Sequence, residues 1–353
     1  MATTRREFLA ASFGTVVSAA IVCSDDDKKP ARPSLAREVG ITTGSFSQQL
    51  KIDPQRFQMP GLIKVIRDEL QMRVVDVYTP SLASFEPKYL DEVRKTADDA
   101  GCLLTNLKLN QPGLDPGSRD KDLRDRSLAE YKRSIDAAVR LGMRWVRPLP
   151  GPSRPDRELL VVGYRELADY AAERGVQLLV ENFGWMQGDP NALVELLDAV
   201  GKNIAASPDT GNWTTNDVRY PGLAKTSPRA VTCDFKARDL GSNGEHDAYD
   251  LKKCFQIGWD AGFRGPWCLE HGHATPKRCS ANCGCCGTIS TNGSPLRETR
   301  NDRLPSVFPS VCVGSRADDG RFCRRGSVHG RAGHDRRHRR SVKEADAVPD
   351  SFV

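Results

Sequence analysis

Residues 175–185 read GVQLLVENFGW, and this stretch decides the fold that the sequence predicts. Residues 176–180 are apolar apart from Gln177, which indicates a short buried strand that ends on Glu181 and Asn182. A carboxylate at the end of an apolar strand must be paired, hydrogen-bonded or bound to a metal, because burying an unpaired charge is costly. The stretch therefore predicts a strand with a functional position at its carboxyl end.

The same layout recurs twice further along the chain. Residues 204–209 (IAASPD) end on Asp209, and residues 266–270 (PWCLE) end on Glu270. In a parallel α/β barrel the carboxyl ends of all strands meet on one face, where active sites lie. Each acid taken alone could instead cap a helix or lie in a solvated loop. Three acids that each end a strand favour one shared site.

Strand and helix patterns alternate along the middle of the chain. The candidate strands are residues 39–43, 73–78, 103–109, 145–149, 177–182, 204–209, 231–236 and 267–270. Helix patterns lie between them, for example at residues 61–70, 88–100, 127–141, 158–174, 191–200 and 249–261. Several end on a glycine before the next strand, as helices often do: Gly101, Gly142, Gly175 and Gly262. Eight such units predict an α/β (β/α)8 TIM barrel. A doubly wound sheet is the alternative, but no glycine-rich phosphate loop follows the first strand.

The positive charge is concentrated outside the predicted barrel. The whole chain of 353 residues has a net charge of +6, of which residues 275–353 carry +7 and residues 1–33 carry +1. The predicted barrel, residues 34–274, therefore carries −2, and its composition indicates no nucleic-acid groove. Six of the eleven cysteines also lie beyond residue 274. Cys102, Cys233, Cys254 and Cys268 fall in apolar patterns, which predicts buried thiols rather than a disulfide framework.

The first residues resemble an export signal. Residues 4–10 read TRREFLA and precede a weakly apolar run that is too short to span a bilayer. A twin-arginine pair in this position is typical of a Tat signal, with small residues at 18–20 suited to cleavage. An ordinary basic N-terminus ahead of a short helix is the alternative. The prediction is a periplasmic or other extracytoplasmic protein that uses the Tat export machinery and has no stable membrane span.

The last part of the chain does not fit the barrel pattern. Residues 275–353 show no helical periodicity where an eighth helix is expected, and residues 277–290 read KRCSANCGCCGTIS. Their cysteine spacing lacks the separated pairs of a zinc site. A frame-shifted or degenerate extension is favoured over a disordered basic tail or a small metal or nucleic-acid module. The predicted organisation is a signal and linker at 1–33, a barrel at 34–274 and an irregular tail at 275–353.

Four motifs give the barrel a specific resemblance. They are SPDTGNW at residues 207–213, CDFKARD at 233–239, GEHDAYD at 244–250 and GFRGPWCLEH at 262–271. With the strand-end acids, they resemble the sugar phosphate isomerase/epimerase superfamily, the xylose isomerase-like TIM barrels. The resemblance covers residues 39 to about 274.

The resemblance implies a divalent metal at the barrel mouth. In that family a Glu, an Asp, a His and a Glu from successive strands hold the ion, and Glu181, Asp209 and Glu270 match three of them. Asp234 stands where a His is common, so the site would be all carboxylate, which favours Mn²⁺ or Mg²⁺ and leaves Zn²⁺ or Co²⁺ open. Asp234 could instead pair with Lys236 or Arg238, in which case His246 is the next candidate ligand.

Further polar and aromatic residues lie at the predicted mouth. They could bind a sugar by hydrogen bonds or stacking, or could only fix loops and cover the core. For His271, substrate contact and a solvated loop are both open. The candidates are Asn182, Asn212, Lys236, His246, His271, Trp185 and Trp213.

The resemblance also implies an activity. It is an exported isomerase or epimerase of a sugar or sugar derivative, in which Glu181 and Glu270 move a proton through an enediolate beside the metal. A secreted carbohydrate-binding barrel without activity is one alternative. An endonuclease IV-like phosphodiesterase is another, but it needs more histidines than this barrel has. The oligomeric state stays open.

Overall fold

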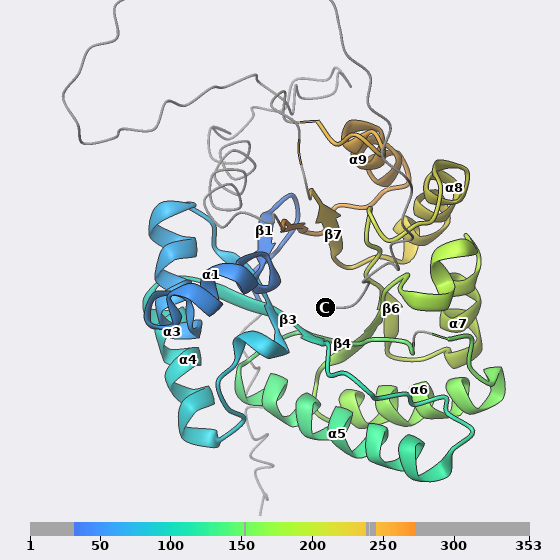
Figure 1. Ribbon diagram of the computed structural model, residues 1–353, viewed down its shortest axis with the longest axis horizontal. Helices are drawn as coiled ribbons and strands as arrows, with labels where there is room; N and C mark the ends of the chain where they lie inside the picture. The colour runs from blue at the N-terminus through green and yellow to red at the C-terminus, as the bar shows by residue number, and fades with distance from the viewer. Residues whose placement is uncertain (1–31, 152, 238–239, 241–244, 273–353) are drawn as a thin grey trace, which may run out of the picture. The chain divides into compact units, whose positions relative to one another are not determined.

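The computed structural model describes residues 32–151, 153–237, 240 and 245–272, and in these ranges strands and helices alternate. The strands are β1 (Val39–Thr42), β2 (Val74–Tyr78), β3 (Leu103–Leu109), β4 (Trp145–Pro148), β5 (Gln177–Val180), β6 (Ile204–Ala206), β7 (Cys233–Lys236) and β8 (Trp267–Glu270). The helices are α1 (Ser47–Ile52), α2 (Pro54–Phe57), α3 (Met59–Lys64), α4 (Pro87–Asp99), α5 (Lys121–Arg140), α6 (Arg157–Ala172), α7 (Ala192–Val200), α8 (Asn216–Thr226) and α9 (Leu251–Asp260). Figure 1 shows the strands around a common axis with the helices outside them.

All eight strands are parallel and follow the order β6-β5-β4-β3-β2-β1-β8-β7. The two ends of this order also meet. Val231 N donates to Ala206 O at 3.1 Å, Asp234 N donates to Pro208 O at 2.9 Å and Thr210 N donates to Asp234 O at 2.9 Å. These bonds join β6 to β7, so the ring of strands is closed and matches the predicted TIM barrel.

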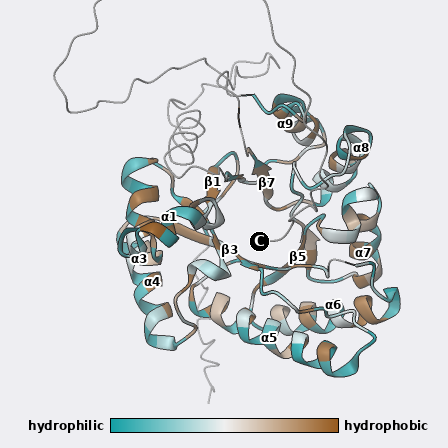
Figure 2. Ribbon diagram, viewed as in Figure 1, coloured by the Kyte–Doolittle hydropathy of each residue, from teal (hydrophilic) through white to brown (hydrophobic). Residues whose placement is uncertain are grey.

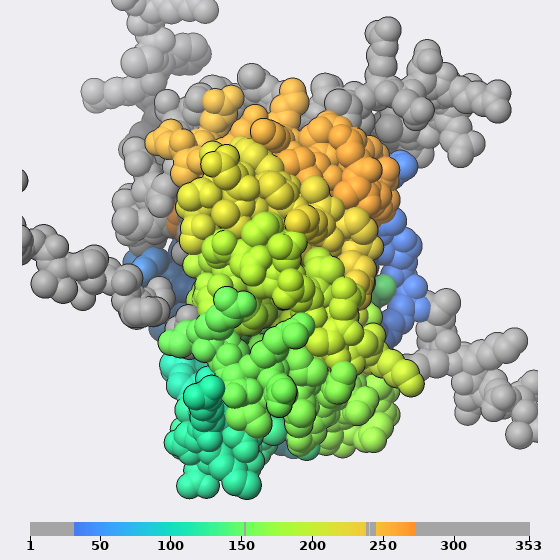
Figure 3. Space-filling view, turned by 90° about the vertical axis from the view of Figure 1, so that its right-hand side faces the viewer, coloured from blue at the N-terminus to red at the C-terminus, as the bar shows by residue number. Residues whose placement is uncertain are grey.

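Apolar side chains fill two separate places in the barrel. The larger cluster lies between the outer faces of the strands and the helices, whose outward faces are hydrophilic in Figure 2. A smaller cluster of residues from several strands fills the interior below the site: Leu35, Val74, Trp145, Leu179, Ala205 and Cys268. Figure 3 shows the helices of the second half covering one side in chain order, from α5 to α9. The interior is therefore a packed core rather than an open channel.

The predicted elements are confirmed, with local differences at their ends. Gly101, Gly142, Gly175 and Gly262 follow helices with φ of 67°, 73°, 70° and 89°, as predicted for helix stops. Helix α5 begins at Lys121, earlier than the predicted residue 127, because the Asp120 side chain accepts hydrogen bonds from the backbone amides of Asp122 and Leu123. Helix α8 is not among the helix patterns named from the sequence, and it contains Pro221.

Several predictions from the sequence fall partly or wholly outside the described residues. They are the export signal, the missing eighth helix and the irregular tail from residue 275. Cys102, Cys233, Cys254 and Cys268 are free and buried, as predicted. In the described ranges, no helix has both the length and the apolar character needed to cross a membrane.

Candidate functional site

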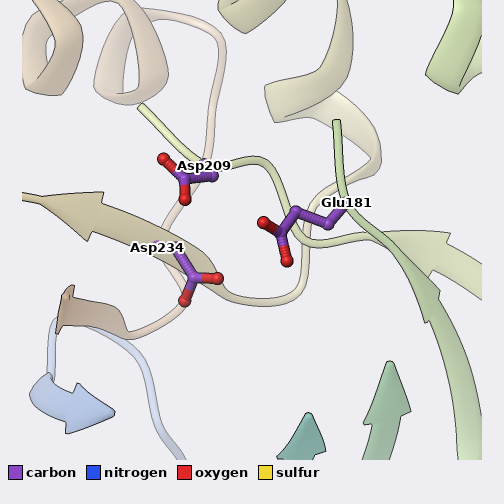
Figure 4. Close-up of side chains that lie close together, drawn as sticks. All are labelled: Glu181, Asp209 and Asp234. Atoms are coloured by element: carbon purple, nitrogen blue, oxygen red, sulfur yellow. The ribbon is translucent and has the colours of Figure 1, made fainter. Parts of the chain in front are cut away.

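Three carboxylates meet at the mouth of the barrel. Glu181 directly follows β5, Asp209 lies three residues beyond β6 and Asp234 belongs to β7. One oxygen from each lies within 4.8 Å of the other two, and all three side chains are buried. Figure 4 shows the carboxylates around one common space. Two of the three strand-end acids predicted to converge, Glu181 and Asp209, belong to this group, and its third member is Asp234.

Asn182 fixes the position of Asp209. Asn182 Nδ2 donates to the backbone oxygen of Asp209 at 3.0 Å, and the backbone amide of Asp209 donates to Asn182 Oδ1 at 2.7 Å. The side chain of Asn182 is fully buried, so both ends of its amide are used inside the protein. The prediction that Asn182 binds sugar hydroxyls is therefore wrong, and the loop-fixing alternative applies.

The turn after Asp209 orients its carboxylate. Asp209 Oδ1 accepts hydrogen bonds from the backbone amides of Gly211 at 2.6 Å and Asn212 at 3.1 Å. An aspartate that bonds to the amides two and three residues ahead fixes its own turn. The backbones of Asp209 and Asp234 also form an isolated parallel β-bridge where β6 and β7 meet. The closure of the ring thus brings these two acids together.

A buried lysine from the opposite part of the ring reaches Asp234. Lys108 Nζ makes an ion pair with Asp234 Oδ1, and it lies 3.9 Å from Asp76 Oδ2. Lys108 is 1% exposed. Of the two pairings considered for Asp234, the one with Lys236 is wrong, and Arg238 lies outside the described residues. Asp234 Oδ2 is buried without a hydrogen-bond partner in the described part of the chain.

An irregularity in β3 turns Lys108 into the barrel. Between β2 and β3 the register shifts, so that Asp76 lies opposite both Thr105 and Asn106. Side chains alternate along a regular strand, so residues 105 and 108 would otherwise point to opposite faces. Thr105 Oγ1 instead donates to Asp76 Oδ1 at 2.6 Å, close to Lys108. The extra residue therefore places Thr105 and Lys108 on the same side.

Two further cations pair with the remaining carboxylates. Arg147 Nε lies 2.8 Å from Glu181 Oε2. Lys236 Nζ lies 2.7 Å from Asp209 Oδ2 and 3.2 Å from Glu270 Oε1. Glu270, the last residue of β8, thus joins the group through Lys236. Each of the four predicted ligands therefore has a basic partner.

Asn212 connects two of these carboxylates. Its Nδ2 donates to Glu181 Oε1 at 2.6 Å, and its Oδ1 accepts from Lys236 Nζ at 2.6 Å. Asn212 and Lys236 are half-buried at the mouth, as the sequence predicted. Their polar atoms already bind the site's own acids, so they position the carboxylates.

Neither histidine candidate belongs to the group of three carboxylates, although His271 directly follows Glu270 in the chain. His271 is 1% exposed, its backbone amide donates to Ser45 Oγ at 2.9 Å and its Nδ1 is bonded to Ala237 O. A solvated loop is therefore the wrong interpretation for His271. The ring of His246 stacks on Tyr249 with centroids 4.0 Å apart, and its Nδ1 accepts from the Ala248 amide. The carboxylate group contains Asp234, the predicted ligand, and does not contain His246, which was the next candidate only if Asp234 paired elsewhere.

The two tryptophans differ in their burial. Trp213 is 3% exposed, and its ring lies so close to Gly222 of α8 that a Cβ there would come within 2.5 Å of it. Trp213 therefore covers the core, and the prediction that it stacks on a sugar is wrong. Trp185 is half-buried, with the guanidinium of Arg154 5.5 Å from its ring centroid. Trp185 stays a candidate for substrate contact.

Burial shifts the proton affinities of the site. It raises the pKa of the Glu181 carboxyl to about 7, against the opposing effect of Arg147 and with a further increase from Asp234 and Asp209. Burial likewise raises the pKa values of Asp209 and Asp234, although Lys236 and Lys108 oppose it. Burial lowers the pKa of Lys108, but Asp234 and Asp76 outweigh it and raise the pKa overall.

The donor set fits a hard divalent cation. Among these described side chains, five carboxylates (Asp76, Glu181, Asp209, Asp234 and Glu270) surround three cations (Lys108, Arg147 and Lys236), which leaves negative charge in excess. Asp234 belongs to the group of three acids, and its Oδ2 has no hydrogen-bond partner in the described part of the chain. Oxygen donors of this kind suit Mg²⁺ or Mn²⁺.

Comparison with known proteins agrees with this architecture. A family described as the xylose isomerase-like TIM barrel matches residues 69–282, which is more than half of the chain. The chain belongs to this family. A search of the curated proteins found no match to this xylose isomerase-like barrel.

Three solved structures share the fold of this xylose isomerase-like barrel. A putative xylose isomerase from Rhodospirillum rubrum is 14% identical with a TM-score of 0.60, and the match covers 73% of this chain and 99% of that one. A D-psicose 3-epimerase from Clostridium cellulolyticum, solved with D-tagatose, is 14% identical with a TM-score of 0.56 over 70% of this chain and 96% of that one. A xylose isomerase-like protein from Mycobacterium smegmatis in complex with magnesium is 19% identical with a TM-score of 0.52 over 71% of this chain and 96% of that one.

Lys108 and Arg147 are not among the residues predicted from the sequence for this xylose isomerase-like site. Both are charged residues inside apolar strands, LLTNLKL for Lys108 and WVRP for Arg147. This is the same signal that identified the strand-end acids, because a charge in a buried strand needs a partner. A search for basic residues near the ends of the predicted strands identifies both of them.

Proposed function

We propose that this protein is a divalent-metal-dependent isomerase or epimerase of a sugar or sugar derivative. The observation that carries the proposal is the meeting of Glu181, Asp209 and Asp234, with oxygens within 4.8 Å of one another. Three strand ends supply these acids, so the barrel itself determines their positions. Rigid strands are suited to hold ligands within the small tolerances that catalysis requires.

The metal would be held by Glu181, Asp209 and Asp234, with Glu270 as the fourth ligand. When bound, a divalent ion would polarise a carbonyl and a neighbouring hydroxyl of the sugar and stabilise developing negative charge. Mn²⁺ and Mg²⁺ suit these oxygen donors best. The D-tagatose and magnesium named for the two related structures support a sugar substrate and an ion of this kind.

Glu181 and Glu270 would move the proton. They come from β5 and β8 and therefore approach the space from strands separated by β6 and β7. The pKa of Glu181, raised by burial to about 7, suits a group that takes and returns a proton near neutral pH. Arg147 Nε forms an ion pair with Glu181 Oε2 at 2.8 Å, and Asn212 Nδ2 donates to Glu181 Oε1 at 2.6 Å, which orients the carboxylate.

The proposal is tested by turnover with a defined metal. Protein freed of metal with a chelator is supplied with Mn²⁺ or Mg²⁺ and offered free pentoses, ketohexoses and oxidised glycosides in deuterated water. We expect isomerised or epimerised product, with deuterium at the carbon beside the carbonyl, only when metal is present. Glu181→Gln should abolish exchange, whereas the matched surface variant Glu166→Gln, whose side chain is 44% exposed, should not.

Two outcomes would replace the proposal with another function. Sugar binding without exchange or turnover on any substrate would favour a carbohydrate-binding barrel. Metal-dependent cleavage of phosphodiesters would favour the endonuclease IV-like alternative.

We also propose export by the Tat route to an extracytoplasmic compartment. The support is the twin-arginine motif of residues 4–10. Replacement of Arg5 and Arg6 by lysine should keep the protein inside the cell, and fractionation of the expressing cells measures this. Equal export of both forms would contradict the route.

A further inference from the structure

The ammonium of Lys236 is held like a bound cation. Lys236 Nζ lies 2.7 Å from Asp209 Oδ2, 2.6 Å from Asn212 Oδ1 and 3.2 Å from Glu270 Oε1. Three oxygens therefore surround one positive charge, two from the segment between β6 and α8 and one from the end of β8. The charge lies between Asp209 and Glu270, two of the carboxylates predicted to bind the metal. The Lys236 side chain is 14% exposed, so it is less deeply buried than Asp209, whose side chain is 0% exposed.

The protein is built to hold the stem of this lysine in place. The backbone amide of Lys236 donates to Thr210 Oγ1 at 2.9 Å, and its carbonyl accepts from the Tyr249 hydroxyl. Its side chain lies against Gly211, where a Cβ would come within 2.5 Å of Lys236 Cδ and 2.9 Å of Lys236 Cγ. The absence of a side chain at Gly211 thus leaves the channel in which the Lys236 stem lies.

We propose that Lys236 is a built-in competitor of the metal, whose ammonium occupies the position between Asp209 and Glu270 and must leave when a divalent ion binds there. This inference rests on the metal site of the proposed function and adds a residue that sets its affinity.

The competition follows from geometry and charge. Metal ligands bind a divalent cation at roughly 2.0–2.6 Å. An ion shared by Asp209 and Glu270 would therefore overlap the ammonium that these acids already contact. Two cations in one buried position also repel each other. Only the fraction of protein with Lys236 withdrawn can bind, so the apparent affinity falls by that fraction.

Substitution of Lys236 tests the competition directly. Isothermal titration of metal-free protein with MnCl₂ should give about tenfold or more tighter binding for Lys236→Met than for the native chain. Lys236→Arg keeps the charge and should stay weak. Lys95→Met removes an exposed lysine paired with Asp99 on α4 and should leave the affinity unchanged.

A second measurement uses the native chain and does not depend on how a variant folds. A lysine-acetylating reagent followed by mass spectrometry should modify Lys236 faster when saturating Mn²⁺ is present, because the displaced ammonium moves away from its three oxygens. Lys95 should react at the same rate with and without metal.

The outcomes separate this inference from the proposed function. The competition would be overturned if Lys236→Met bound Mn²⁺ no more tightly than a native chain that itself binds well, and if Lys236 were acetylated at the same rate with and without Mn²⁺. The metal site of the proposed function would still be supported. No Mn²⁺ binding by any variant would overturn both. Tighter Mn²⁺ binding by Lys236→Met than by the native chain would support both the competition and the metal site.

Discussion

Arg147 Nε lies 2.8 Å from Glu181 Oε2, and the two side chains are only 3% and 4% exposed. The pair joins neighbouring strands, because Arg147 belongs to β4 and Glu181 directly follows β5. Arg147 Nη2 also donates to Asn110 Oδ1 at 2.9 Å, which holds the guanidinium from a second side. A charge pair buried this deeply is costly to break, since the remaining charge loses its partner and cannot reach water.

Removal of Arg147 should strongly destabilise the barrel. Arg147→Met is expected to lower the free energy of unfolding by about 3–5 kcal/mol, because Glu181 is left without its ion-pair partner. Urea denaturation of the metal-free protein measures this. Arg140→Met is the control, because Arg140 forms a surface ion pair with Asp91. The Arg140 side chain is 44% exposed and the Asp91 side chain is 56% exposed. That control should cost at most about 1 kcal/mol. Equal losses for both variants would show that the Arg147 pair contributes no more than a surface pair.

Stability of the metal-free protein should fall as the pH rises through the acidic range. Burial raises the pKa of Glu181 from 4.5 to about 7, despite Arg147, so the folded state binds a proton that the unfolded state has lost between these values. The free energy of unfolding should therefore decrease from about pH 4.5 to 7, and Asp209 and Asp234 shift in the same direction. Urea midpoints across this range measure it. Glu181→Gln should flatten the profile, and an unchanged slope in that variant would contradict the assignment.

Saturating Mg²⁺ should stabilise the protein more at high pH than at low pH. The ion binds the ionised carboxylates, so the stabilisation that it provides grows as the pH rises. The difference in urea midpoint with and without Mg²⁺ should increase between pH 5 and about pH 8. A difference that is constant or shrinks with pH would argue against carboxylate ligands.

Asn182 should act on the metal through Asp209. Asn182→Ala removes two hydrogen bonds to the Asp209 backbone, and the metal affinity is expected to fall by about 10–100-fold, as for other residues that orient ligands. Mn²⁺ titration measures the loss, and denaturation should show about 1–3 kcal/mol of destabilisation. Asn191→Ala is the matched control, because that exposed amide contacts only Lys225 among the side-chain bonds described. Similar effects from both substitutions would contradict a positioning role for Asn182.

Lys108 and Asp234 should behave as a coupled pair. Lys108→Met leaves Asp234 buried without its cation and is expected to cost about 3–5 kcal/mol of stability. Lys108→Met combined with Asp234→Asn removes both charges and should recover a large part of that loss. A double-mutant cycle by urea denaturation measures the coupling. Additive effects of the two substitutions would show that the pair does not interact.

The order of strands and helices could be predicted because its signals are local. An apolar run such as residues 176–180 and a glycine such as Gly175 need no knowledge of distant residues to indicate a strand and a helix stop. Parallel strands joined by helices also have one common face for their carboxyl ends. These rules are sufficient to predict that Glu181 and Asp209 lie at the same end of the barrel.

The partners of those acids could not be predicted in the same way. Asp234 is 126 residues away from Lys108, and only the closed ring and the register shift in β3 bring the two together. The roles of Asn182, His271 and Trp213 were equally undecided, because each type of side chain can bind a ligand or support the core. Burial and hydrogen bonds decide between these roles, and both depend on the packed ring.

The sequence by itself thus determined a barrel and the positions along it where acids end the strands. The tertiary structure alone decided that each acid is paired, with Lys108, Arg147 or Lys236, and that Asn182 serves Asp209 rather than a sugar. The physical reason is the range of the interactions. Periodicity and turn chemistry act over a few residues, whereas a charge in a buried site selects the nearest opposite charge in space, from any strand that the closed ring brings within reach.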